Sequence, residues 1–119
     1  MPHGFSESEL STLVALLDRI IPEDDFPSAS QAGCLDFIIG LASADASLLE
    51  TYQAGISVLD EWSLPHRFHN LRPETQDMLL ERLEPSRFGA LVIRQAIEAY
   101  YAGPNSQKAW EMVGFKVTC

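Results

Sequence analysis

The placement of proline constrains the fold of this sequence more than any other feature. Apart from Pro2, each proline falls between segments whose apolar residues recur every three or four positions. That spacing places apolar side chains on one face of an α-helix, and proline interrupts a helix because it lacks the backbone N–H. No segment shows the alternation typical of a β-strand. The sequence therefore predicts an all-α protein, most of whose helices are separated by prolines.

The first predicted helix has the clearest start signal. Ser6 and Glu9 match the Ser-x-x-Glu capping box, and Phe5, one residue before the cap, is placed to pack on Leu10. The apolar stripe continues to Pro22, where we expect the helix to end.

Two further helices are expected before residue 63. The second runs from about Gln31 to Ala42, with Ser30 as its N-cap. The third runs from about Ala46 to Trp62, with Asp45 as its N-cap. Asp60, near the end of the third helix, is expected to face water.

The rest of the chain predicts two more helices and an aromatic tail. A short turn is expected around Phe68, and Pro73 begins the fourth helix. The fifth lies in "FGALVIRQAIEAYYAGP", which is apolar on nearly all sides and so predicts the central helix. Trp110 and Phe115 follow it. The predicted fold is a compact five-helix bundle with this C-terminal tail packed on it.

Length and charge limit the class of protein. A chain of 119 residues with 46% hydrophobic content fits one domain, residues 1–119. The net charge of −9 argues against binding to nucleic acid or to anionic membranes, both of which need clustered Lys and Arg. No run of roughly 18 apolar residues is present, so membrane insertion is not expected.

The N-terminus and the cysteines bear on the compartment. "MPHGFSESEL" lacks the basic start and apolar core of a secretory signal, and no twin-arginine pair is present. The expectation is a cytoplasmic chain, or a periplasmic one if a twin-arginine leader has been removed. Cys34 and Cys119 are too few for a disulfide framework. Cys34 is predicted to be a buried apolar residue, and an intermolecular disulfide through Cys119 is the less favoured interpretation.

Motifs for catalysis and cofactor binding are missing from the sequence. It contains no Gly-rich dinucleotide or phosphate motif, no Gly-x-Ser-x-Gly and no Cys-x-x-Cys-His. His66 and His69 have the spacing of two zinc ligands on one helical turn, but zinc needs further ligands and no spacing supplies them. Two partly exposed loop histidines are the favoured interpretation, and no metal, cofactor or catalytic residue is assigned to this chain.

The stretch "RIIPEDDFP" places acids after a helix C-terminus, where negative charge is unfavourable. Its contiguous acids do not have the alternating ligand spacing of a calcium loop. One interpretation is a solvated turn in which Asp24 or Asp25 accepts backbone N–H groups, with Arg19 partly neutralising it. The other is an acidic surface for the basic groups of a partner.

Aromatic residues point to protein–protein contact, because aromatic side chains are frequent anchors of interfaces. Trp110 and Phe115 have a rival interpretation, in which they cap the protein's own core. The predicted partner-binding residues are Asp24, Asp25, Phe26, Tyr101, Trp110 and Phe115.

The segments also resemble a known family when they are taken in order. They are "LSTLVALLDRIIPEDDFPSASQAGCLDFI", "YQAGISVLDEWS", "FHNLRPETQDMLLERLE", "FGALVIRQAIEAYYAGP" and "AWEMVGF". In this order they resemble the small third subunit of gluconate 2-dehydrogenase, over nearly the whole chain.

The resemblance implies a non-catalytic accessory subunit that helps a large subunit to fold, to stay soluble and, where the small subunit carries a twin-arginine leader, to be exported with it. The partner would be a large FAD-dependent sugar or polyol dehydrogenase of the glucose-methanol-choline type, in some members with a separate cytochrome subunit. FAD would then belong to the partner. Two features depart from the family pattern: the leader is missing, and the usual Gly-Gly-Asn stretch before the Trp is reduced to "NSQK".

Two other functions are considered. The first is a free-standing helical adaptor or regulator with another partner, suggested by the missing leader and the shortened tail. The second, more remote, is a small metal-dependent enzyme that uses His66, His69 and nearby acids.

Overall fold

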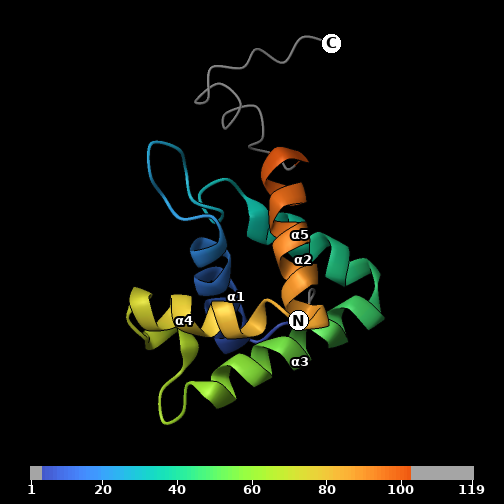
Figure 1. The fold of residues 1–119 in the computed structure, drawn as a ribbon. Helices are drawn as coiled ribbons and strands as arrows, with labels where there is room; N and C mark the ends of the chain where they lie inside the picture. The colour runs from blue at the N-terminus through green and yellow to red at the C-terminus, as the bar shows by residue number, and fades with distance from the viewer. Residues whose placement is uncertain (1–3, 103–119) are drawn as a thin grey trace.

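The computed structural model describes residues 4–102, and across this range the chain is all-α with no strand (Figure 1). This confirms the predicted five-helix fold, whereas the predicted packing of Trp110 and Phe115 lies outside the described residues. In chain order the elements are α1 (Glu7–Ile20), α2 (Cys34–Ala44), α3 (Ala46–Trp62), the 3-10 turn η1 (Phe68–Asn70), α4 (Pro73–Leu83) and α5 (Arg87–Ala102).

The starts of α1 and α3 follow the capping signals in the sequence. Ser6 Oγ accepts the Glu9 N–H at 3.1 Å, and Glu9 Oε1 accepts the Ser6 N–H at 2.8 Å. Asp45 Oδ1 accepts the N–H groups of Ser47 and Leu48 at 3.0 and 3.2 Å. Both caps satisfy N–H groups that have no partner within the helix.

The predicted start of α2 was wrong. The helix begins at Cys34, and its N-cap is Gly33 in the left-handed conformation, with φ of 87°, which a glycine adopts without steric cost. Ser30 caps nothing. Its N–H and hydroxyl instead donate to the two carboxylate oxygens of Asp18 at 2.8 and 2.7 Å, which fastens the segment before α2 to α1.

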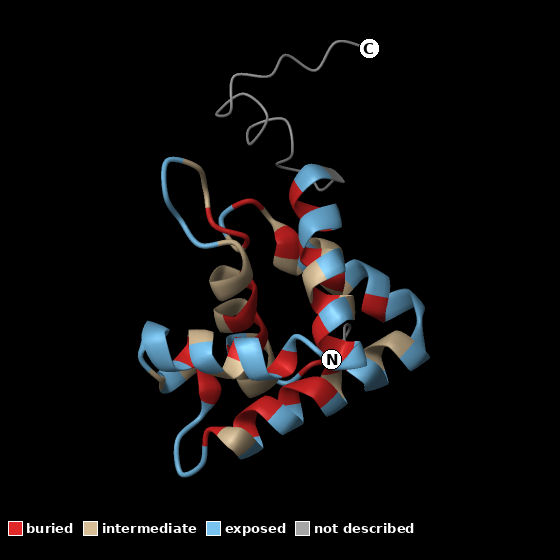
Figure 2. Ribbon diagram, viewed as in Figure 1, coloured by how far each residue is buried: buried red, intermediate tan, exposed pale blue. Residues whose placement is uncertain are grey.

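The core lies where α1 and α5 pack against the other helices (Figure 2). Its largest fully buried side chains are Tyr52, Phe5, Phe68, Leu13, Leu16, Leu17, Ile38, Ile56, Leu59 and Val92. At Gly55 α3 approaches α5 so closely that a Cβ would overlap the Phe88 ring.

The expectation that α5 is buried on nearly all sides was wrong. Val92, Ala96 and Ala99 are fully buried on the inner face, whereas Ile97 and Tyr101 are 47% and 46% exposed. Its small inner residues let α5 pack closely, and the larger apolar residues are left on an outer face.

Asp60 was also predicted wrongly, since it is buried and does not face water. Its carboxylate accepts the Thr12 hydroxyl at 3.1 Å and the Phe68 N–H at 2.9 Å, and Arg67 Nη1 lies 3.4 Å away. We call these four residues the Asp60 cluster. It ties the end of α3 to α1 and to η1.

Candidate functional site: an acidic, aromatic groove

The acidic turn after α1, residues 23–26, is closed by hydrogen bonds. The helix ends where the Ile21 N–H donates to Leu17 O at 2.9 Å, and Pro22 cannot donate in the same way. Asp24 Oδ1 then accepts the Phe26 N–H at 2.9 Å, and the Asp24 N–H donates to Phe26 O at 3.1 Å. This confirms the predicted turn in which an aspartate accepts a backbone N–H.

The charge of the turn is not neutralised by Arg19, contrary to the expectation. The Arg19 guanidinium points to α4 and holds both carboxylate oxygens of Asp77, at 2.8 and 3.1 Å. That hydrogen bond raises the pKa of Arg19. Within residues 4–102 no ion pair involves Glu23, Asp24 or Asp25, and all three are exposed.

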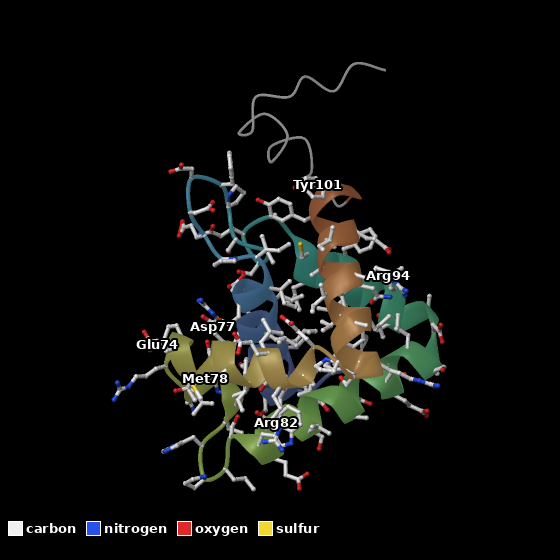
Figure 3. All side chains as sticks on the ribbon, viewed as in Figure 1. Glu74, Asp77, Met78, Arg82, Arg94 and Tyr101 are labelled. Atoms are coloured by element: carbon white, nitrogen blue, oxygen red, sulfur yellow. The ribbon has the colours of Figure 1, made fainter. Side chains whose placement is uncertain are left out.

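A groove of about 460 Å³ lies between the turn and the last two turns of α5. Tyr100 closes one side, because its hydroxyl donates to Pro27 O at 2.7 Å. Figure 3 shows Tyr101 at the end of α5 that faces the turn. We call this site the acidic groove; its lining residues are Ile20, Ile21, Pro22, Asp24, Phe26, Pro27, Ile97, Tyr100 and Tyr101.

The two tyrosines of the groove differ in exposure. Tyr100 is buried and meets the half-exposed ring of Tyr101 edge to face, with 5.3 Å between ring centres. Burial raises the pKa of Tyr100, with smaller contributions from Tyr101 and Asp24. Tyr100 therefore stays a neutral hydrogen-bond donor that fixes the turn, and its position gives it a structural role.

Three of the six predicted partner-binding residues meet in this groove. Asp24, Phe26 and Tyr101 line it, although more than seventy positions separate Phe26 from Tyr101 in the sequence. Asp25 is exposed in the same turn but does not line the groove. Trp110 and Phe115 lie outside the described residues.

Sequence reasoning missed two contributors to the site. Ile97 is a large apolar residue exposed on the groove side of α5. Asp18 fixes Ser30 and with it the segment that follows the turn. The apolar residues all around α5 were the available signal for Ile97, because a helix with one buried face leaves such residues on the surface.

Metal-ligand residues do not gather in the described part of the chain. No group of three or more His, Cys, Asp or Glu there could hold a metal ion. His66 is exposed, and His69 Nδ1 is buried without a hydrogen-bond partner. Cys34 is fully buried, its thiol donates to Ala96 O at 3.7 Å, and burial raises its pKa to about 11.

A second groove lies at the other end of α5. It has a volume of about 380 Å³, and we call it the α3–α5 groove. Its rim is basic, since Arg87 lines it and the Arg82 guanidinium stacks over the Trp62 ring at 4.2 Å from the ring centre. Gly55, Val58, Trp62 and Phe88 supply its apolar surface.

No helix in residues 4–102 combines the length and the hydropathy needed to cross a membrane. The acidic groove offers apolar and aromatic surface beside uncompensated negative charge. That combination is suited to holding another polypeptide, because aromatic anchors with a charged rim are typical of protein interfaces.

Comparison with models of known protein families gives a match. The family described as gluconate 2-dehydrogenase subunit 3 matches residues 7–116, nearly the whole chain. Searches of curated proteins and of solved structures found no match.

Proposed function

The chain belongs to the gluconate 2-dehydrogenase subunit 3 family, and we propose that it is a non-catalytic accessory subunit of an FAD-dependent oxidoreductase. Its partner is a large sugar or polyol dehydrogenase of the glucose-methanol-choline type. The family match over residues 7–116 is the observation that carries this proposal. Gluconate is the substrate that the family name supplies, and other sugars or polyols fit the same proposal.

In this division of labour the large subunit holds FAD and the catalytic base, and a cytochrome subunit can join as a third component. The small subunit contributes a surface that stabilises the large one. The described residues offer such a surface in the acidic groove, with Phe26 and Tyr101 as aromatic anchors and Asp24 and Asp25 beside them.

Because the acidic turn carries uncompensated negative charge, we expect a basic patch on the surface of the partner. Opposite charges across an interface raise the rate of association and fix its register. The net charge of −9 extends the same attraction over a longer range. We include Trp110 and Phe115 among the residues that would meet the partner; both lie outside the described residues.

Co-expression with a large FAD-dependent subunit from the same host tests the proposal. The expected result is a yellow, stoichiometric complex, together with more soluble large subunit than is obtained when that subunit is expressed by itself. Recovery of the small chain only as a separate protein, with no effect on the solubility or activity of the flavoprotein, contradicts the proposal. Capture of a partner that is not an oxidoreductase favours the adaptor function.

Paired substitutions then test the surface. Asp25→Lys and Tyr101→Ala are expected to weaken the complex about tenfold or more, since truncation of an interface anchor typically costs over 1 kcal/mol. Glu50→Lys on α3 makes the same charge change at an exposed site, and Met78→Ala removes a side chain 69% exposed on α4. Figure 3 shows Met78 far from Tyr101, so these two controls should bind normally.

A further inference from the structure

The acidic groove lies where the described chain ends. Tyr100 and Tyr101 line it, and Ala102 is the last residue of α5. Residues 103–119 therefore continue from the rim of the groove. The segment therefore starts next to Tyr100 and Tyr101.

The groove presents apolar surface that association would bury. Ile97 and Tyr101 are 47% and 46% exposed, and Phe26 is half-buried beside them. A volume of about 460 Å³ is large enough for an aromatic side chain and its neighbours. Removing such surfaces from water is favourable in proportion to the apolar area covered.

The segment 103–119 has the matching chemistry. Trp110, Met112, Val113 and Phe115 are its large apolar residues, and its charged side chains are Lys108, Glu111 and Lys116, with one net positive charge. The rim of the groove carries the acidic turn, whose carboxylates have no ion pair within residues 4–102. Eight residues from Ala102 to Trp110 span up to about 27 Å when extended, so Trp110 can reach any part of the groove.

The α3–α5 groove is a poorer seat for the same segment. Its Arg82 and Arg87 would face Lys108 and Lys116 with like charge. It also lies at the opposite end of α5, since Phe88 is about 21 Å from Ala102 along the helix axis. Charge and distance both favour the acidic groove.

We propose that residues 103–119 fold back onto the acidic groove of the same chain. Trp110 is then seated against Phe26, Ile97 and Tyr101, with Lys108 and Lys116 near the acidic turn. In the isolated chain the docked segment covers Phe26 and Tyr101, so a partner that uses these two anchors has to displace it. This inference concerns the isolated chain and stands or falls independently of the proposed partner.

Tryptophan fluorescence of the full chain tests this docking. In a Trp62→Phe background Trp110 is the only tryptophan. Its emission is expected at shorter wavelength than in the urea-unfolded chain, with severalfold weaker quenching by acrylamide. Emission and quenching equal to those of the unfolded chain overturn the proposal, and this comparison needs no groove variant to fold.

Two substitutions in the same background locate the seat of Trp110. Ile97→Asp in the acidic groove should shift the emission to longer wavelength and restore the quenching. Val58→Asp is the matched control, because Val58 is 38% exposed in the α3–α5 groove. Circular dichroism checks that both variants are helical. A shift with Val58→Asp but none with Ile97→Asp overturns the proposal.

Dilution separates docking within one chain from docking between copies. Emission that is constant over a hundredfold dilution supports docking in the same chain. Emission that moves to longer wavelength on dilution, with a matching change in mass by light scattering, assigns the segment to a second copy and contradicts the proposal.

Discussion

Asp60 and Asp25 are both aspartates near the C-terminus of a helix, where the helix dipole disfavours negative charge. Around Asp60 the fold compensates for this, because Thr12, Phe68 and Arg67 all donate to its carboxylate. Around Asp25 it does not. The side chain is exposed and has no hydrogen bond or ion pair within residues 4–102.

The difference separates two uses of acidic residues in one small chain. The Asp60 cluster is internal, and its carboxylate holds three elements together. In the acidic turn Asp24 accepts the Phe26 N–H and Glu23 accepts a hydrogen bond from Gln31 Nε2 at 3.3 Å, but all three carboxylates are exposed to solvent. A carboxylate whose charge the fold leaves without an ion pair is available to a partner or to another segment of the chain.

The largest expected effect is on the Asp60 cluster. Asp60→Ala leaves the Thr12 hydroxyl and the Phe68 N–H buried without an acceptor, and each such group costs about 1–3 kcal/mol. We expect the free energy of unfolding to fall by about 3 kcal/mol, measured by urea denaturation. Glu61→Ala, one residue on and exposed, should change it by under about 0.5 kcal/mol. If Asp60→Ala lowers the free energy of unfolding no more than Glu61→Ala does, the Asp60 cluster does not stabilise the fold.

The next effect is a dependence of stability on pH. The pKa of Cys34 rises from 9.0 to about 11 on folding, so the unfolded chain loses its thiol proton first. The contribution of the buried thiol to the free energy of unfolding is complete below pH 9. It is lost as the pH rises toward 11, and the total loss is about 2–3 kcal/mol. Burial also raises the pKa of Tyr52 and Tyr100, which adds to the same decline.

Urea denaturation at pH 8 and pH 10.5 measures this decline, with Cys34→Ala as the comparison. The variant should lose less stability between the two pH values than the unsubstituted chain, because only the tyrosines still contribute. Equal losses in the two proteins would mean that the Cys34 thiol is not shielded from water.

A moderate effect is expected at Asp18, which joins α1 to the segment that follows the acidic turn. Asp18→Ala removes two hydrogen bonds to Ser30, for a loss of about 1–2 kcal/mol. The segment after the turn should also exchange its amide hydrogens faster. Asp36→Ala, an exposed acid on α2, is the control. Unchanged exchange around Ser30 would show that Asp18 does not fix this segment.

The smallest effect on stability is expected in the turn. Asp24→Ala removes one exposed hydrogen bond, worth about 0.5 kcal/mol, and Asp25→Ala removes none. Asp25→Ala should leave the melting temperature unchanged and still weaken the complex with the large subunit. If Asp25→Ala destabilises the protein and leaves binding normal, Asp25 serves the fold and not the partner, which contradicts the comparison with Asp60.

The features that could be predicted from the sequence were those set by neighbouring residues. Ser6 with Glu9 and Asp45 with Ser47 lie within a few positions of each other, so each cap can be identified in a short window. The acidic turn belongs to the same class, because Asp24 bonds a residue two positions away.

The features that were missed depend on partners far away in the chain. Asp60 bonds Thr12 across 48 positions, and Ser30 bonds Asp18 across 12, so neither contact could be inferred from a local pattern. The acidic groove is of the same kind. Phe26 and Tyr101 were each chosen as aromatics, but only the packing of α5 beside the end of α1 brings them together.

Hydrogen–deuterium exchange of this chain, with and without the large FAD-dependent subunit, tests the central claim most directly. We predict that residues 21–26 and 97–102 gain protection on binding, while α4, residues 73–83, does not. Protection confined to α4 or to the α3–α5 groove, with none at the acidic groove, would contradict the account.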